Sequence, residues 1–414
     1  MRAYWQGLTT RGHAVLAGGV LVALLAVALG QRELLRIAVL LVALPVVAAL
    51  VLGRRDDRLT VVRELEPEQA PVGGTATVRI RVHNVGTRTS GPLVVEDRLD
   101  RTLGVVPRLL VERLAPGAWA GAEYEVAARV RGRHRIGPMA LRIEDPFGLV
   151  RTTRTATTTH TLIVTPVVAP LRRGALLAAA GGTGDGLARR AAAGGQDDVG
   201  TREYRSGDEL RRVHWRATAR TGSLMVRQEE QPWEAQALVL LDGRARAHSP
   251  ASPAAPADLT TSSFEWAVHA AASIVTHLAQ TDRRVRLVAG DTEVTVTGGS
   301  TAPMLDALAV LRPAKHGELV PHAAHESHPP VVVAVLGSLE AADVAALTAL
   351  RGANARGVAV VLDPGTWAGA PTAGTTAGAP DAQAALAPLV AAGWHAVLAR
   401  RGDVLADVWD RATR

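Results

Sequence analysis

The chain of 414 residues contains no cysteine, which excludes disulfides, thiolate metal ligands and a cysteine nucleophile. Aromatic residues make up only 3% of the sequence, and all but one of its 46 basic residues are arginine. These arginines are interleaved with acidic residues instead of forming long basic runs, which argues against a nucleic-acid partner. Hydrophobic residues make up 48% of the chain, and a chain of this length is typical of two or three domains.

Two long apolar stretches lie near the N-terminus, at residues 12–31 and 37–53. Each is close to the roughly 20 residues that a helix needs to cross a bilayer. A cleavable signal peptide would account for the first stretch, but a second one follows within a few residues. We therefore expect residues 1–53 to form a transmembrane hairpin in the lipid bilayer of the cell membrane. More arginines flank the hairpin than lie in its short link, which predicts two spans with both termini in the cytoplasm.

Residues 54–172 show a period of two. In "TATVRIRVHN", residues 75–84, every second residue is apolar and the intervening ones are polar, a pattern typical of strands with one buried face. Similar runs recur between Gly, Pro and Asn, and about seven such strands predict an antiparallel, immunoglobulin-like β-sandwich. Residues 173–198 are rich in Gly and Ala, and we interpret them as a flexible linker.

Residues 237–414 alternate short apolar runs with helical patterns. Runs such as "ALVLLD", "VVVAVLG" and "GVAVVLD" are apolar on both faces, which is typical of parallel strands covered by helices. This part is predicted to be a doubly wound α/β domain. The chain as a whole is therefore predicted to be a multidomain α+β protein.

The segment 199–236 joins these parts and contains "GTREYRSGDELRRVHWRATARTGSL". Ser206 and Glu209 have the spacing of a capping box, which predicts a helix that runs to Arg220 and ends at Gly222. The charged, aromatic and glycine residues of the segment are its candidate functional positions. They are Arg202, Glu203, Tyr204, Gly207, Asp208, Arg211, Arg212, His214, Trp215, Arg216 and Arg220.

Three interpretations of this segment remain open. Its charges could form a structural ion network, its helix could dock a partner, or His214 with Glu203 or Asp208 could act as the general base of a hydrolase. No nucleophile at a defined spacing accompanies His214. Our hypothesis divides the roles between two groups. The structural group is Arg202, Glu203, Tyr204 and Asp208, and the group available for contact is Arg211, Arg212, Trp215 and Arg216.

The same segment, with "RGRHRIGPMALRIEDPFGLV" before it and "LVLLD" after it, resembles the signature of the bacterial domain-of-unknown-function 58 family. The resemblance implies two N-terminal spans, a β-sandwich and a C-terminal α/β domain like the von Willebrand factor type A domain. It also implies a MoxR-type AAA+ ATPase as a partner and a transglutaminase-like membrane protein as a possible second partner. By this resemblance the protein is expected to be a non-enzymatic adaptor without a cofactor.

The sequence departs from the resemblance at one position that bears on metal binding. Type A domains that bind a divalent ion carry D-x-S-x-S after the first strand, which supplies oxygen ligands to a hard cation. Here Asp242 is present, but Arg244 and Arg246 stand where the two serines would be. No carboxylate follows the later strand "VVVAVLG" directly. We therefore expect a degenerate site at Asp242 that holds no metal.

Overall fold

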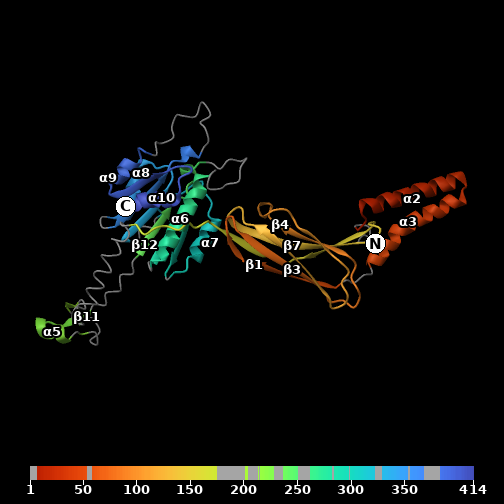
Figure 1. The fold of residues 1–414 in the computed structure, drawn as a ribbon, viewed down its shortest axis with the longest axis horizontal. Coiled ribbons are helices and arrows are strands. Elements are labelled where there is room, and N and C mark those ends of the chain that lie inside the picture. Colours follow the sequence, from red (N-terminus) through yellow and green to blue (C-terminus); the bar gives the residue numbers. More distant parts are fainter. Residues whose placement is uncertain are drawn as a thin grey trace, which may run out of the picture. The chain divides into compact units, whose positions relative to one another are not determined.

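The computed structural model describes residues 7–53, 58–174, 201–203, 213, 215–227, 236–249, 262–281, 284–297, 299–321, 329–352, 355–367 and 383–414. The chain divides into two compact units, Met1–Thr165 and Pro166–Arg414 (Figure 1). The architecture is α+β, with two apolar N-terminal helices and a body rich in β-sheet.

The first unit begins with a helical hairpin of α2 (Thr10–Leu29) and α3 (Arg32–Gly53). Thr9 caps α2, since its hydroxyl accepts a hydrogen bond from the Gly12 N–H, and Gly30 ends α2 in the left-handed conformation at φ 64°. Both helices are long and apolar enough to cross a membrane. The expected pair of apolar helices is therefore present.

Two β-sheets follow in the same unit. The first has the order β1-β3-β6 and the second β2-β9-β7-β4-β5, with β8 paired to β7. Both are antiparallel except for the parallel pair β2 and β9. Their bounds are β1 Leu59–Glu66, β2 Gln69–Pro71, β3 Thr75–Asn84, β4 Leu93–Leu99, β5 Arg108–Val111, β6 Trp119–Ala127, β7 Gly132–Glu144, β8 Arg151–Ala156 and β9 His160–Thr165.

The alternating pattern of the sequence explains how the two sheets pack. Val78, Ile80 and Val82 of β3 are buried and share one hydrophobic core with residues of β4, β7 and β9. The intervening Arg79 and Arg81 point outward and pair with glutamates on neighbouring strands. The predicted antiparallel sandwich is therefore confirmed.

A buried ion pair joins the two sheets. The Arg63 guanidinium on β1 donates to both carboxylate oxygens of Asp97 on β4, at 2.9 and 2.5 Å, and both side chains are fully buried. Arg63 also donates to the carbonyl oxygens of Ile136 and Thr158, while the Tyr124 hydroxyl donates to Asp97 at 2.7 Å. Burial and this hydrogen bond raise the pKa of Tyr124, so its hydroxyl keeps its proton.

Residues 166–174 belong to the second unit, although we assigned 166–172 to the sandwich. His269 Nδ1 lies 2.8 Å from the Val167 carbonyl oxygen, and the Ala169 N–H donates to the Ser273 hydroxyl at 2.9 Å. The Trp409 indole N–H donates to the Arg172 carbonyl oxygen at 3.0 Å. The segment changes partners here because its polar backbone groups find acceptors and donors on helices of the second unit.

The second unit contains a six-stranded sheet of order β14-β13-β12-β15-β16-β17, in which only the edge strand β14 is antiparallel to its neighbour. Its strands are β12 Gln236–Leu241, β13 Arg284–Ala289, β14 Thr292–Val296, β15 Val331–Leu336, β16 Arg356–Leu362 and β17 Trp394–Ala399. Its helices are α6 Ser263–Ala279, α7 Ala302–Val310, α8 Ala341–Arg351, α9 Leu386–Ala391 and α10 Leu405–Thr413.

Helices cover both faces of this sheet. On β12, Val239 and Leu241 pack into the core with α6, α7 and α10, whereas Leu238 and Leu240 pack into a second core with α8 and α9. Strands that bury both faces must be apolar throughout, which is why these runs lack polar alternation. The predicted doubly wound arrangement is confirmed, and the short β14 is an element that the sequence pattern did not reveal.

Candidate functional site

The signature segment contains a small β-ribbon beside a short helix. Strand β10 (Thr201–Glu203) pairs antiparallel with β11 (Met225–Arg227), and α5 runs over Trp215–Thr221. Gly222 ends α5 at φ 76°, and its N–H donates to the Thr218 carbonyl oxygen at 2.9 Å. The predicted helix end is therefore confirmed.

The predicted extent of this helix was wrong on its N-terminal side. Val213 forms an isolated antiparallel bridge with Val226, and both side chains are buried. A residue in a β-bridge does not lie inside a helix. The β-branched valine is better satisfied by a cross-strand apolar contact than by a helical turn.

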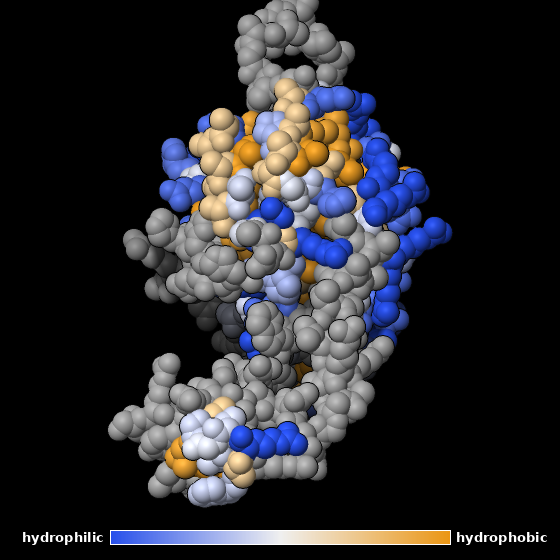
Figure 2. Space-filling model, turned by 90° about the vertical axis from the view of Figure 1, so that its left-hand side faces the viewer, coloured by the Kyte–Doolittle hydropathy of each residue, from blue (hydrophilic) through white to orange (hydrophobic). Residues whose placement is uncertain are grey.

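The structure describes only some of the candidate functional residues of the signature segment. Tyr204, Gly207, Asp208, Arg211, Arg212 and His214 lie outside the described residues, and for Arg202, Glu203 and Arg216 only the backbone is described. Trp215 is 70% exposed, and Arg220 is exposed as well. Figure 2 shows this segment at the bottom of the view, with hydrophobic and strongly hydrophilic residues side by side on its surface.

The second candidate site lies at the carboxyl end of β12. The Arg244 guanidinium donates from Nε and Nη2 to the two carboxylate oxygens of Asp242, at 2.9 and 3.0 Å. Its Nη1 donates to Asp343 Oδ1 at 2.7 Å. All three residues are buried, and Asp242 is completely so. One arginine thus bridges two carboxylates that are 101 positions apart in the chain.

Backbone groups complete this buried cluster. The Gly337 N–H donates to Asp242 Oδ2 at 3.3 Å, and the Glu340 N–H donates to Asp343 Oδ2 at 2.9 Å as part of the capping box of α8. Burial lowers the pKa of Arg244, but hydrogen bonds and charge from Asp242 and then Asp343 outweigh it and raise the pKa overall. The guanidinium therefore stays charged between the carboxylates.

This geometry corrects the expectation about Arg244. We treated Arg244 and Arg246 as cations that repel a metal, but only Arg246 is exposed, while Arg244 is buried and paired. No carboxylate follows β15 directly, as the sequence indicated, but Asp343 reaches the cluster from the first turn of α8. The spacing of Glu340 and Asp343 at a helix start was the signal that could have revealed it.

His248 lies beside the cluster and has two polar neighbours. Its Nε2 donates to the Asp242 carbonyl oxygen at 2.8 Å, so its Nδ1, which is 3.3 Å from the Ser263 hydroxyl, is the acceptor. Ser263 is completely buried. The Ser263 hydroxyl also accepts a hydrogen bond from the Ser249 N–H at 3.0 Å.

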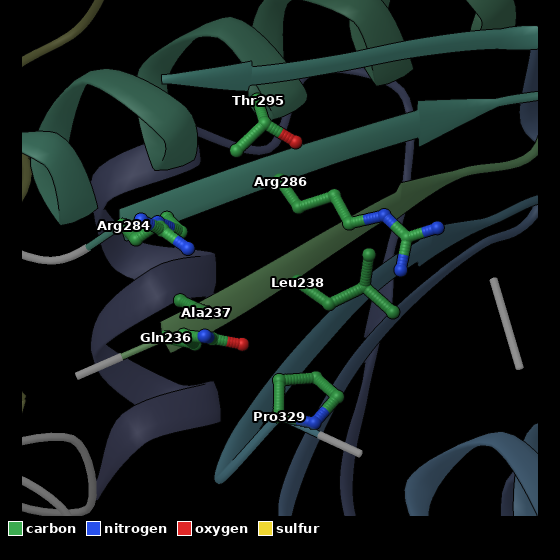
Figure 3. A pocket seen from close by; sticks show the side chains of 7 residues that line it. All are labelled: Gln236, Ala237, Leu238, Arg284, Arg286, Thr295 and Pro329. Carbon is green, nitrogen blue, oxygen red and sulfur yellow. The ribbon is translucent and has the colours of Figure 1, made fainter. Parts of the chain in front are cut away.

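A pocket of about 250 Å³ lies at the opposite, amino end of the strands (Figure 3). Its lining residues are Gln236, Ala237, Leu238, Arg284, Arg286, Thr295 and Pro329. Ligands of open α/β sheets bind outside the carboxyl ends of the strands. The position of this pocket therefore does not mark it as the functional site.

Acid should destabilise the second unit through its buried histidines. Burial lowers the pKa values of His248, His269 and His277 below 6.5. Below that pH the unfolded chain binds protons that the folded chain does not, so stability is complete above pH 6.5 and is lost as the pH falls towards the folded-state pKa values. We expect the urea midpoint of the full chain in lipid nanodiscs, followed by tryptophan fluorescence, to fall below pH 6.5. A midpoint that stays constant or rises with acid would contradict this.

The protein is of the α+β class, with two apolar helices, a β-sandwich and an α/β unit. In the α/β unit, Arg244 pairs with the carboxylates of Asp242 and Asp343 at the carboxyl end of β12. Residues 200–334 match the family model described as "Protein of unknown function DUF58". The matched region includes most of the signature segment and about the first half of the α/β unit. No curated protein matches the chain.

Solved structures resemble the chain only in part. The CARDB domain of a Pyrococcus furiosus protein, crystallised with di-metal ions, has 18% identity and a TM-score of 0.20, over 27% of this chain and 88% of its own. The putative ApaA protein of Bordetella pertussis has 13% identity and a TM-score of 0.19, over 26% of this chain and 92% of its own. The fold assignment therefore rests on the strand order and register described above.

Proposed function

We propose that this protein is a membrane-anchored adaptor without catalytic activity, whose α/β unit and signature segment engage a MoxR-type AAA+ ATPase in the cytoplasm. In this proposal α2 and α3 span the cell membrane and both termini face the cytoplasm. A transglutaminase-like membrane protein is a second candidate partner. No cofactor takes part.

The proposal includes a second unit of the von Willebrand factor type A kind, and the strand order and the position of Asp242 support this part of it. Strands β13 and β15 flank β12 on opposite sides. The strand order therefore switches from one side of β12 to the other at this point. Asp242 follows β12 directly, at the crevice where open α/β sheets bind ligands. In a metal-dependent type A domain this crevice would hold the ion.

The observation that carries the adaptor role is the position of Arg244. Its guanidinium lies between Asp242 and Asp343, where a cation would otherwise balance the two carboxylates. A crevice filled by a side chain of its own protein offers neither an open metal position nor a free general base. Of the functions considered, recognition of a protein partner is the one that needs neither. Trp215 is exposed on α5, and tryptophan is enriched at protein–protein interfaces.

The hydrolase alternative requires His214 together with Glu203 or Asp208. His214 and Asp208 lie outside the described residues, and the Glu203 side chain is not described. No contact in the described part of the chain favours this alternative.

Replacing Trp215 with alanine should abolish partner binding without affecting the fold. Because this side chain is exposed, the free energy of unfolding should change by no more than about 0.5 kcal/mol, whereas loss of an aromatic anchor costs an interface about 2 kcal/mol or more. The measurement is crosslinked co-purification of the AAA+ ATPase from membranes, with and without ATP, together with a thermal melt.

Val390→Ala is the matched control, since Val390 is an exposed apolar residue of α9, outside the signature segment. It should retain the ATPase. If the parent chain recovers no AAA+ ATPase under either condition, the proposed partnership is wrong. If Trp215→Ala recovers as much ATPase as the parent, α5 is not the contact.

A further inference from the structure

The end of the β-sandwich next to the helical hairpin carries two exposed aromatic side chains. Trp119 begins β6 and is 55% exposed, and Phe147, in the turn between β7 and β8, is 63% exposed. Among the aromatic residues of the first unit that the structure describes, only Tyr124 is not exposed, and it binds Asp97. In a chain with so few aromatics, exposure of both at one end calls for a physical explanation.

Strand register places the two aromatics at the same end. Trp119 pairs with His83, and the adjacent Asn84 pairs with Leu59 at the start of β1, which follows α3 after a few residues. In the other sheet Phe147 follows the end of β7, where Ile143 pairs with Leu93. Both sheets thus place an aromatic residue at the end next to the hairpin.

The hairpin is attached to this end by direct contacts. Leu8 forms a β-bridge with Val150, the Thr9 N–H donates to the Leu149 carbonyl oxygen at 2.9 Å, and the Thr9 hydroxyl donates to the Gly148 carbonyl oxygen at 2.6 Å. Gly12 lies so close to Leu149 that a Cβ there would be 2.2 Å from its carbonyl oxygen. Leu8 also packs against the sandwich core, together with apolar residues of both helices: Val15, Leu44, Ala48, Ala49 and Leu52.

These contacts determine how deep the turn lies relative to the spans. Helix α2 has 20 residues and is therefore about 30 Å long, close to the thickness of the hydrocarbon layer. Its first residue, Thr10, then lies at the boundary between hydrocarbon and headgroups. The turn that holds Phe147 is hydrogen-bonded to Thr9, so it lies at the same depth.

Defined contacts hold the turn of Phe147 and the ring of Trp119. In the turn, Asp145 accepts hydrogen bonds from the N–H groups of Phe147 and Val150, at 3.0 and 2.6 Å. The Trp119 ring stacks on His83, with ring centroids 4.1 Å apart and planes 4° from parallel. Aromatic rings in fixed positions at headgroup depth are characteristic of membrane interfaces.

Basic side chains lie beside the aromatics. Asn84 ties two loops of this end together, since its side-chain N–H groups donate to the carbonyl oxygens of Arg88 and Leu114, each at 2.8 Å. Arg88 and Arg113 are both exposed on these loops, together with one acidic neighbour, Glu112. Basic groups near a bilayer surface are attracted to anionic headgroups.

We propose that this end of the sandwich is a lipid-binding surface, in which Phe147 and Trp119 insert into the headgroup layer and Arg88 and Arg113 contact anionic lipid phosphates. The bilayer thus holds the sandwich in a fixed orientation on the membrane. This proposal rests on the membrane anchoring by α2 and α3 put forward above. It gives the β-sandwich a second contact with the membrane, at the headgroup layer, in addition to its attachment to α2 and α3.

The absence of cysteine allows a direct test with single nitroxide labels. Phe147→Cys, Trp119→Cys and Val105→Cys are labelled in the full chain and reconstituted in vesicles of phosphatidylcholine and phosphatidylglycerol. Val105 is 91% exposed and follows the other end of β4, roughly 23 Å from the hairpin end along the strands. We expect labels at 147 and 119 to show a several-fold higher ratio of oxygen to water-soluble nickel accessibility than the label at 105.

A fourth label separates this proposal from the anchoring on which it depends. Val20 lies near the middle of α2 and is 49% exposed, so Val20→Cys must report lipid if α2 spans the bilayer. A water-accessible label at 20 would overturn the anchoring. Lipid contact at 20 with a water-accessible label at 147 and 119 would overturn the lipid surface alone. Low accessibility to both reagents at 147 would mean that protein covers the site and would also overturn it.

Discussion

Replacement of Arg244 by methionine should destabilise the α/β unit by about 3–5 kcal/mol, because it leaves two buried carboxylates without their shared cation. Among the described residues, the remaining hydrogen-bond donors would be backbone N–H groups: those of residue 244 and Gly337 to Asp242, and that of Glu340 to Asp343. The measurement is urea unfolding of the full chain in nanodiscs, followed by fluorescence of the unit's buried tryptophans, Trp266, Trp367, Trp394 and Trp409.

Arg246→Met is the matched control, two positions further along the chain. The Arg246 side chain is exposed and lies 3.9 Å from an exposed Glu340, and such surface pairs contribute at most about 1 kcal/mol. Equal stability of the Arg244 and Arg246 variants would show that the buried bridge is not what balances the carboxylates.

The same cluster determines the expected response to metal ions. Titration of the parent chain with magnesium or manganese should show no stoichiometric binding at Asp242, since the guanidinium already lies between the carboxylates. In Arg244→Ser the two carboxylates and a hydroxyl could supply oxygen ligands to a hard cation. Recovery of stability by this variant on adding the metal, with no change in the parent, would identify Arg244 as the substitute for the ion.

Removal of the charge of Asp97 should have an effect of similar size in the sandwich. Asp97→Asn leaves the Arg63 guanidinium buried without a counterion and weakens the acceptor for Tyr124, which is expected to cost about 3–5 kcal/mol. Since Arg63 and Asp97 belong to different sheets, the loss of stability should be seen in both sheets. Hydrogen exchange of peptides from β1 and β4 in the full chain measures it.

The neighbouring Glu64→Gln provides the comparison for Asp97. Glu64 pairs with Arg81 on the surface, where both side chains are substantially exposed, so its replacement should change stability by less than about 1 kcal/mol. Protection in β1 and β4 that is unchanged in Asp97→Asn would mean that the buried pair does not hold the sheets together.

The sequence alone determined the elements whose signal is local. The two apolar helices follow from length and hydropathy, β3 from a period of two, and β12, β15 and β16 from runs that are apolar on both faces. Gly222 could be predicted as a helix end because a left-handed residue is required there. These features depend on neighbours within a few positions, and a single sequence displays them.

Only the tertiary structure decided which distant groups meet. Asp343 reaches Arg244 because β12 and β15 are adjacent and α8 begins just beyond β15. The local sequence indicates a helix start at Asp343 but not the contact of Asp343 with Arg244. In the same way Val213 joins Val226 across a ribbon instead of continuing the helix of Trp215. Strand order and register bring such groups together, and both are selected by burial over the whole fold, which outweighs local spacing.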